Sequence, residues 1–207
     1  MLNELFILVS YAFLGAGIKY ADQAYDLDVF SKTKANILAI PGATLMTYLI
    51  IFDPPSTTIF FSILLIVAIT KKIDNIAFYI GTGILLSLPL IFHDVLQIAW
   101  LPFGILIFSG ILDEIGNDWA DKRRKKKRLN NPRNNMDNSL LKNFGENFFL
   151  HRFVMKIAVL VLTLFGLFQY IYFFAFLLFD IMYLLVEQYS FSIKRYSLTK
   201  PGLPMKG

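Results

Sequence analysis

Two clusters of acidic residues carry side-chain types that bind divalent cations. The first cluster consists of three carboxylates and two lysines that follow them: Asp22, Asp26, Asp28, Lys32 and Lys34. Asp22 and Asp26 are four residues apart and share one face of a helix, where a bound cation would relieve the repulsion between their charges. Tyr25 lies inside this cluster.

The second cluster consists of five oxygen-bearing side chains followed by two cations: Asp113, Glu114, Asn117, Asp118, Asp121, Lys122 and Arg123. Asp113, Asn117 and Asp121 are spaced four residues apart and form one stripe along a helix. Carboxylate and amide oxygens suit Mg²⁺, which often also binds substrate phosphates, and the cations behind each cluster could neutralise remaining phosphate charge. The pattern predicts a site for Mg²⁺ and a diphosphate shared by both clusters. Alternatively, each cluster is a charged helix end in water.

Apolar runs of the length needed to cross a membrane separate the clusters. A hydrocarbon layer of about 30 Å requires about 20 helical residues. The expected crossings are residues 5–17 extended to 20, 37–52, 57–69, 76–92, 95–112, and two helices within 153–191 that turn near 166–169. The predicted fold is an all-α, polytopic bundle of about seven transmembrane helices, which forms one membrane domain over residues 1–207.

The distribution of cationic residues predicts the orientation of these helices. Segments rich in Lys and Arg alternate with segments that have neither, and cationic segments resist translocation. We therefore expect the amino terminus outside, the carboxyl terminus in the cytoplasm, and both acidic clusters at the cytoplasmic face of the cell membrane. The cytoplasmic loop 113–152 contains the basic run 122–128, which is expected to contact anionic lipid headgroups.

The composition excludes several other classes of protein. Of the 207 residues, 56% are hydrophobic and only 17% are charged, whereas soluble domains have about 25% charged residues. The chain has no cysteine, which excludes disulfides and thiolate metal sites. The net charge of +5 comes from a few loops rather than from a basic surface with interspersed aromatics, so nucleic acid is not an expected partner.

The two clusters and their separation resemble the UbiA-type superfamily of intramembrane prenyltransferases. That family has two Asp-rich motifs at cytoplasmic helix ends, separated by four membrane helices, as expected here for Asp22-Gln-Ala-Tyr-Asp26-Leu-Asp28 and Asp113-Glu-Ile-Gly-Asn117-Asp118-Trp-Ala-Asp121. Lys32-Thr-Lys34-Ala and Ile40-Pro41-Gly42-Ala43 are similar to the basic, Pro- and Gly-containing stretch after the family's first motif. The resemblance covers residues 18–124. This chain lacks the family's Asn before the first cluster, and seven helices are expected instead of nine.

The resemblance implies an enzyme that transfers an isoprenoid group from a Mg²⁺-bound diphosphate to a lipophilic acceptor. The implied catalytic residues are Asp22, Asp26, Asp113 and Asp118. The implied metal ligands are Asp22, Asp26, Asp28, Asp113, Asn117, Asp118 and Asp121. The implied diphosphate-binding residues are Lys32, Lys34, Lys122, Arg123 and Tyr25.

Two other functions are compatible with the sequence. A small cation transporter or channel would need acidic residues throughout the depth of the membrane, where the sequence clearly places only Asp180. A non-catalytic scaffold would use the basic loop to bind anionic lipid. A charged side chain inside a membrane costs about 2.5–3.5 kcal/mol, so Asp180 should face the bundle and meet a partner, either an acceptor substrate or another side chain.

Overall fold

The computed structural model describes residues 2–70, 85, 91, 96–130 and 153–199. Regular structure within these residues is entirely α-helical. The helices are α1 Glu4–Asp26, α2 Lys32–Phe52, α3 Pro54–Ile69, α5 Trp100–Asn130, α7 Phe153–Leu164 and α8 Tyr170–Thr199. Most of the predicted crossing at 76–92, and residues 131–152 of the predicted loop, lie outside the described residues.

Local polar and conformational signals determine where these helices begin and end. Asn3 caps α1 by accepting a hydrogen bond from a backbone N–H of the first turn at 2.9 Å. Asp53 separates α2 from α3, accepts a hydrogen bond from the N–H of Ser56, and is followed by Pro54 at the first helical position. Helices α7 and α8 are separated by a turn in which Gly166 has a φ of 73°, a conformation that glycine adopts without strain. Both separations fall where the sequence placed a turn.

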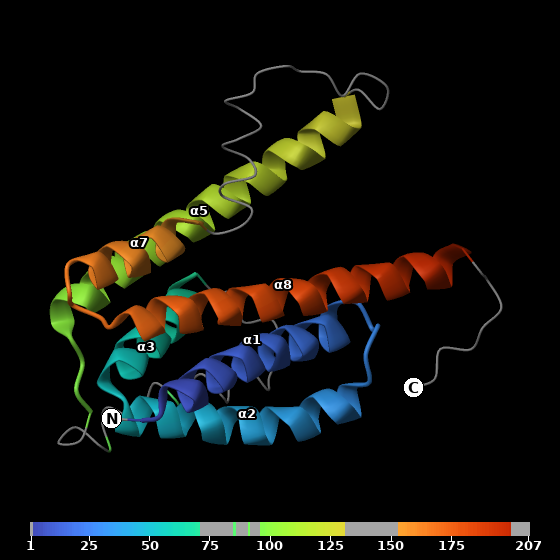
Figure 1. Cartoon of the computed structure of the whole chain (residues 1–207). Coiled ribbons are helices and arrows are strands. Elements are labelled where there is room, and N and C mark those ends of the chain that lie inside the picture. The colour runs from blue at the N-terminus through green and yellow to red at the C-terminus, as the bar shows by residue number, and fades with distance from the viewer. Residues whose placement is uncertain (1, 71–84, 86–90, 92–95, 131–152, 200–207) are drawn as a thin grey trace.

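Helices α1 and α8 form a parallel pair in the lower part of the view in Figure 1. Their contact advances in the same direction along both chains, from Gly15 beside Phe179 to Gln23 beside Ser190. Helix α2 returns antiparallel to α1 and packs on it (Figure 1). Helix α5 packs on α3 and α7, while α3 also contacts α2 and α7 also contacts α8. The chain therefore connects α5 to the α1–α8 pair through α3 and α7.

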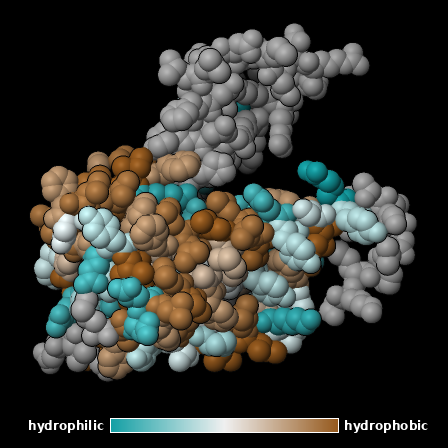
Figure 2. Space-filling view, in the orientation of Figure 1, coloured by the Kyte–Doolittle hydropathy of each residue, from teal (hydrophilic) through white to brown (hydrophobic). Residues whose placement is uncertain are grey.

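An apolar core fills the space between these helices. Its fully buried members include Tyr11 of α1, Leu49 of α2, Phe60 of α3 and Leu162 of α7. Apolar side chains also cover much of the outer surface of the described residues, as Figure 2 shows. Helices α1, α2 and α8 are long and apolar enough to cross a membrane, whereas α3 and α7 are shorter apolar helices. The structure is therefore compatible with a membrane protein.

The extent of α5 differs from the sequence-based map. The map ended this helix at Leu112 and began a loop at Asp113, but α5 continues to Asn130. Residues 113–130 contain one glycine, no proline and many Lys and Arg residues, which favour helix continuation. Of the seven predicted crossings, the described residues support three helices of spanning length.

The close approach of α1 and α8 predicts a strong effect of one methyl group at Gly15. A Cβ atom there would meet the carbonyl oxygen of Phe179 far inside van der Waals distance, so the two helices would have to separate. We expect Gly15→Ala to lower the free energy of unfolding by about 1–3 kcal/mol, measured as a lower midpoint of thermal unfolding in detergent.

Gly17→Ala provides a matched control on the same helix. Its Cβ atom would meet only the Leu38 side chain, at 4.0 Å, and the higher helix propensity of alanine should leave stability unchanged or improved. Equal unfolding midpoints for the two variants would contradict the close contact at Gly15.

Candidate functional site

A buried cation held between two carboxylates links α1 to α8. Lys19 is 6% exposed, and its Nζ lies 2.9 Å from Oδ2 of Asp22 and 3.0 Å from Oε1 of Glu187 on α8. The same Nζ lies 4.7 Å from the ring centroid of Tyr183, one turn before Glu187, which adds a cation–π contact. We call Lys19, Asp22, Tyr183 and Glu187 the Lys19 cluster.

Polar and aromatic contacts continue on the carboxyl-terminal side of the Lys19 cluster. Buried Ser190 donates a hydrogen bond from its Oγ to Oε1 of Gln23 at 2.9 Å. Phe30, between α1 and α2, stacks on Tyr20 of α1 and on Tyr189 of α8, with ring centroids 4.4 Å and 6.3 Å apart. These contacts hold the α1–α2 turn against α8. We refer to this end of the fold, where α1 ends and α2 begins, as the Lys19 end.

The first acidic cluster lies at the Lys19 end, and Asp22 belongs to both groups of residues. Asp26 is the last residue of α1 and is exposed. Asp28 has a φ of 51°, and its Oδ1 lies 2.7 Å from Nζ of Lys32. Both of these side chains are more than half exposed, so their ion pair adds little to stability and leaves them accessible to a ligand.

The other predicted residues of this turn are also accessible. The hydroxyl of Tyr25 donates a hydrogen bond to Oδ1 of Asn36 at 2.7 Å, and Nζ of Lys32 lies 5.8 Å from the Tyr25 ring centroid. Lys34 is exposed on the first turn of α2. The structure thus places the acids, lysines and tyrosine of the first cluster on the end of α1, the turn after it and the first turn of α2.

Asp113, a predicted metal ligand, caps a helix in the structure. Its side chain is 2% exposed and accepts hydrogen bonds from the backbone N–H groups of Val154, at 3.0 Å, and Met155, at 2.7 Å. These groups belong to the first turn of α7, whose N–H groups have no partner within that helix. Both carboxylate oxygens of Asp113 are therefore used to hold α7 against α5.

The rest of the second cluster lies farther along α5. Asn117 is half-buried, Asp118 and Lys122 are exposed, and the guanidinium carbon of Arg123 lies 5.3 Å from the ring centroid of Trp119. The side chain of Asp121 lies outside the described part of the structure. No group of three or more acidic or histidine side chains able to hold a metal ion occurs among the described residues. The main helix contacts of α5 are with α3 and α7, whereas those of α1 are with α8 and α2, so the two clusters have different neighbours.

Lys156 of α7 and Asp180 of α8 form an ion pair that the sequence analysis did not identify. Nζ of Lys156 lies 2.7 Å from Oδ2 of Asp180, and the two side chains are 10% and 24% exposed. The same Nζ lies 4.6 Å from the ring centroid of Phe153. Asp180 was expected to need a partner, and Lys156 is the only cation between residues 153 and 193. Because Lys156 is an isolated cation in an apolar run, the sequence could have identified it as the partner of Asp180.

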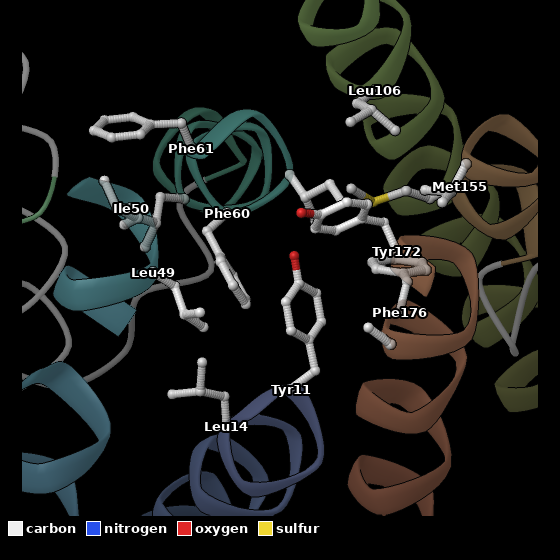
Figure 3. Close-up of a cluster of buried hydrophobic side chains, with 14 of the residues drawn as sticks. Tyr11, Leu14, Leu49, Ile50, Phe60, Phe61, Leu106, Met155, Tyr172 and Phe176 are labelled. Atoms are coloured by element: carbon white, nitrogen blue, oxygen red, sulfur yellow. The ribbon is translucent and has the colours of Figure 1, made fainter. Parts of the chain in front are cut away.

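Asp53 forms a buried polar centre at the opposite end of the α1–α8 pair. It is 3% exposed, its Oδ1 accepts a hydrogen bond from the Tyr172 hydroxyl at 2.7 Å, and its Oδ2 accepts one from the N–H of Ser56 at 3.2 Å. The Tyr11 hydroxyl in turn donates to Oγ of Ser56 at 2.9 Å. Figure 3 shows the hydroxyl groups of Tyr11 and Tyr172 directed toward α3. Asp53 thus joins α3 to α8 directly, and Ser56 extends this connection to Tyr11 of α1.

Comparison with protein-family models, curated proteins and solved structures found no match for this chain. The Lys19 end presents exposed carboxylates beside exposed lysines, a combination that can bind a cation and an anion together. Asp53 and the Lys156–Asp180 pair are instead ionisable groups in apolar surroundings.

Removing the charge of Lys19 should weaken the α1–α8 pair. Lys19→Met keeps the length of the side chain but leaves Asp22 and Glu187 without their shared cation, which we expect to cost about 3 kcal/mol. Thermal unfolding in detergent should show a lower midpoint, and adding Glu187→Gln should recover part of the loss. Lys34→Met, the same change at an exposed site, is the control. Strictly additive effects of Lys19→Met and Glu187→Gln would show that the two residues are not coupled.

The cap at Asp113 can be tested through α7. Asp113→Ala should lower stability by about 1–2 kcal/mol and speed hydrogen exchange of the backbone amides of Val154 and Met155. Asp118→Ala changes an exposed carboxylate on the same helix and should leave that exchange unchanged. If both variants exchange these amides at the wild-type rate, Asp113 does not cap α7.

Proposed function

We propose that this protein is a multi-pass integral-membrane enzyme that transfers an isoprenoid group from a Mg²⁺-bound diphosphate to a lipophilic acceptor. The proposal includes seven crossings of the cell membrane, with the amino terminus outside and the carboxyl terminus in the cytoplasm. The sequence resemblance and the three helices of spanning length support it. In this orientation the Lys19 end faces the cytoplasm.

The arrangement of side chains at the Lys19 end carries the proposal. The last turn and a half of α1 carries Asp22 and Asp26, the following turn carries Asp28, and the start of α2 carries Lys32 and Lys34. Helix α8 adds Glu187, whose Oε1 and the Oδ2 of Asp22 both contact Nζ of Lys19, so these two carboxylates face each other at close range. Mg²⁺ that arrives with a diphosphate commonly takes one or two carboxylates as ligands and completes its shell with water and phosphate oxygens. The exposed carboxylates of this turn fit that mode of binding, which needs no preformed cage.

The residues of this turn have distinct expected roles toward the donor. The ammonium groups of Lys32 and Lys34 would contact diphosphate oxygens, and the Tyr25 hydroxyl would turn from Asn36 to donate to one of them. When the bond between the isoprenoid carbon and the diphosphate oxygen breaks, the diphosphate leaves with the electron pair and the lysines stabilise its charge. The acceptor then bonds to the carbon and loses a proton. Bound Mg²⁺ would supply further neutralisation of the leaving group.

The second cluster has a smaller part in this proposal than the resemblance alone implies. Asp113 is engaged as the cap of α7, and α5 has its main contacts with helices other than α1. The remaining predicted ligands from the resemblance are Asn117, Asp118, Asp121, Lys122 and Arg123. They are proposed to act with the first cluster from a separate helix.

Binding of a donor analogue tests the proposed site. Purified protein in lipid nanodiscs would be titrated with farnesyl thiodiphosphate, with and without Mg²⁺, by calorimetry. We expect saturable binding that EDTA abolishes and that Asp26→Asn weakens at least tenfold. Glu4→Gln makes the same change of charge at the other end of α1 and should bind like the wild type. If the thiodiphosphate bound equally well without Mg²⁺ and to Asp26→Asn, the proposed site at the Lys19 end would be ruled out.

The same titration separates the enzyme from a lipid-binding scaffold. A scaffold that uses the basic run 122–128 would bind vesicles of anionic phospholipid but would show no saturable, Mg²⁺-dependent binding of the thiodiphosphate. Asp26→Asn would not weaken such vesicle binding, because it removes a negative charge and leaves every Lys and Arg in place.

A further inference from the structure

The side of α5 that faces away from α3 and α7 is exposed and apolar. On the inner side, Leu106 is buried, Asp113 holds α7, and a Cβ atom at Gly110 would meet Ile66 of α3. On the other side, large apolar side chains that are 39–66% exposed recur every three or four residues, a spacing that returns to the same face of a helix. We call them the α5 outer stripe: Leu101, Ile105, Phe108, Leu112, Ile115 and Trp119.

The two tryptophans of the chain lie at the two ends of this stripe. Trp100 is the first residue of α5 and is 75% exposed, and Trp119 is 45% exposed. At 1.5 Å per residue they are about 28 Å apart along the helix axis, close to the thickness of about 30 Å of a hydrocarbon layer. Tryptophan is enriched at both interfaces between a membrane and water. The stripe therefore has the length of one membrane crossing, with a tryptophan for each interface.

Cations occur at only one end of the stripe. The sequence has no Lys or Arg between residues 73 and 121, so none lies near Trp100 along the chain. Lys122 and Arg123 follow Trp119 by three and four residues and return to its side of the helix. Lys122 is exposed, and the guanidinium carbon of Arg123 lies 5.3 Å from the ring centroid of Trp119. One face of α5 thus changes from aliphatic side chains to an indole and then to cations.

A phospholipid fits this face better than a second copy of the chain does. Two copies in one membrane have the same orientation, so pairing of their outer stripes would place the helical basic runs 122–128 side by side, where like charges repel. An anionic headgroup is instead attracted to cations that follow a membrane helix. The order of side chains along the stripe also matches the acyl chains, glycerol esters and phosphate of a lipid in the cytoplasmic leaflet.

We propose that the cytoplasmic half of the α5 outer stripe binds an anionic phospholipid. Its acyl chains lie along Leu112 and Ile115, its glycerol esters lie level with Trp119, and its phosphate contacts Lys122 and Arg123. The site rests on the membrane placement proposed above but not on the transferase reaction. It assigns Lys122 and Arg123 to a lipid headgroup, whereas the resemblance assigns them to the donor diphosphate.

Fluorescence quenching in vesicles tests this site, because one substitution isolates each tryptophan. Trp100→Phe leaves Trp119 as the only tryptophan of the full chain, which would be reconstituted in vesicles of phosphatidylcholine and phosphatidylglycerol at equal mole fractions. In one set of vesicles the phosphatidylglycerol carries bromine on its acyl chains, and in the other set the phosphatidylcholine does. We expect brominated phosphatidylglycerol to quench Trp119 about threefold more strongly than brominated phosphatidylcholine, because the two cations concentrate the anionic lipid beside it.

Two further comparisons separate charge from position. Trp119→Phe isolates Trp100, which has no neighbouring cation in the sequence and should be quenched equally by the two lipids. In the Trp100→Phe background, Lys122→Met with Arg123→Met should abolish the preference at Trp119. Lys122→Arg with Arg123→Lys keeps both charges and should keep the preference.

Three results would overturn the proposal. They are equal quenching of Trp119 by both lipids with the cations in place, a preference that survives the double methionine variant, and no quenching of Trp119 by either lipid. The last result would mean that protein covers the stripe, as in a dimer.

Binding of farnesyl thiodiphosphate in nanodiscs of phosphatidylcholine alone is a separate readout. A double methionine variant that loses the lipid preference but binds the donor like the wild type supports the lipid site. Absence of donor binding in the wild type alongside an intact lipid preference would refute the transferase and support the lipid site.

Discussion

The buried ammonium group of Lys19 sets the relation between α1 and α8. An ammonium ion removed from water is costly unless opposite charge lies close to it, and here Asp22 and Glu187 both lie within 3.0 Å of Nζ. Asp22 belongs to the same helix and Glu187 to the neighbouring one. Their shared contact therefore specifies the register of the parallel pair. One turn earlier, Gly15 allows the two backbones to meet at the same register, so charge pairing and close packing agree.

Polar contacts through α7 and α8 connect the two acidic clusters. Asp113 of the second cluster holds the first turn of α7, Lys156 in that turn pairs with Asp180 of α8, and α8 reaches Lys19 and Asp22 through Glu187. The sequence predicted that these clusters share a metal ion. Within the described residues, two helices and their polar contacts connect the clusters.

The parts of the fold that follow from local chemistry could be predicted from the sequence. Asp53 with Pro54 ends one helix and starts the next, and Gly166 marks the turn before α8. These features are predictable because each residue acts on the backbone next to it in the sequence. The role of Asp53 as a shared acceptor depends on Tyr172, which is 119 residues later in the chain, and no local pattern predicts that pairing. The partner of Asp180 could have been predicted from the sequence, since Lys156 is the isolated cation of an apolar run. The capping of α7 by Asp113 could not be predicted from a local pattern, because the N–H groups that donate to it are 41 and 42 residues later in the chain.

The shortness of α7 has a consequence for α5. Its 12 residues cover only about 18 Å, less than the hydrocarbon layer of about 30 Å. In the proposed membrane placement, with the carboxyl-terminal turn of α7 near one surface of the bilayer, its first N–H groups lie too deep for bulk water to reach. An acceptor must then come from the protein, and α5 supplies it. Inserting a single residue between Gly110 and Asp113 would rotate the Asp113 carboxylate by about 100° around the α5 axis. The N–H groups of the first turn of α7 would then have no acceptor in their apolar surroundings. The length of one helix thus constrains the rotation of another.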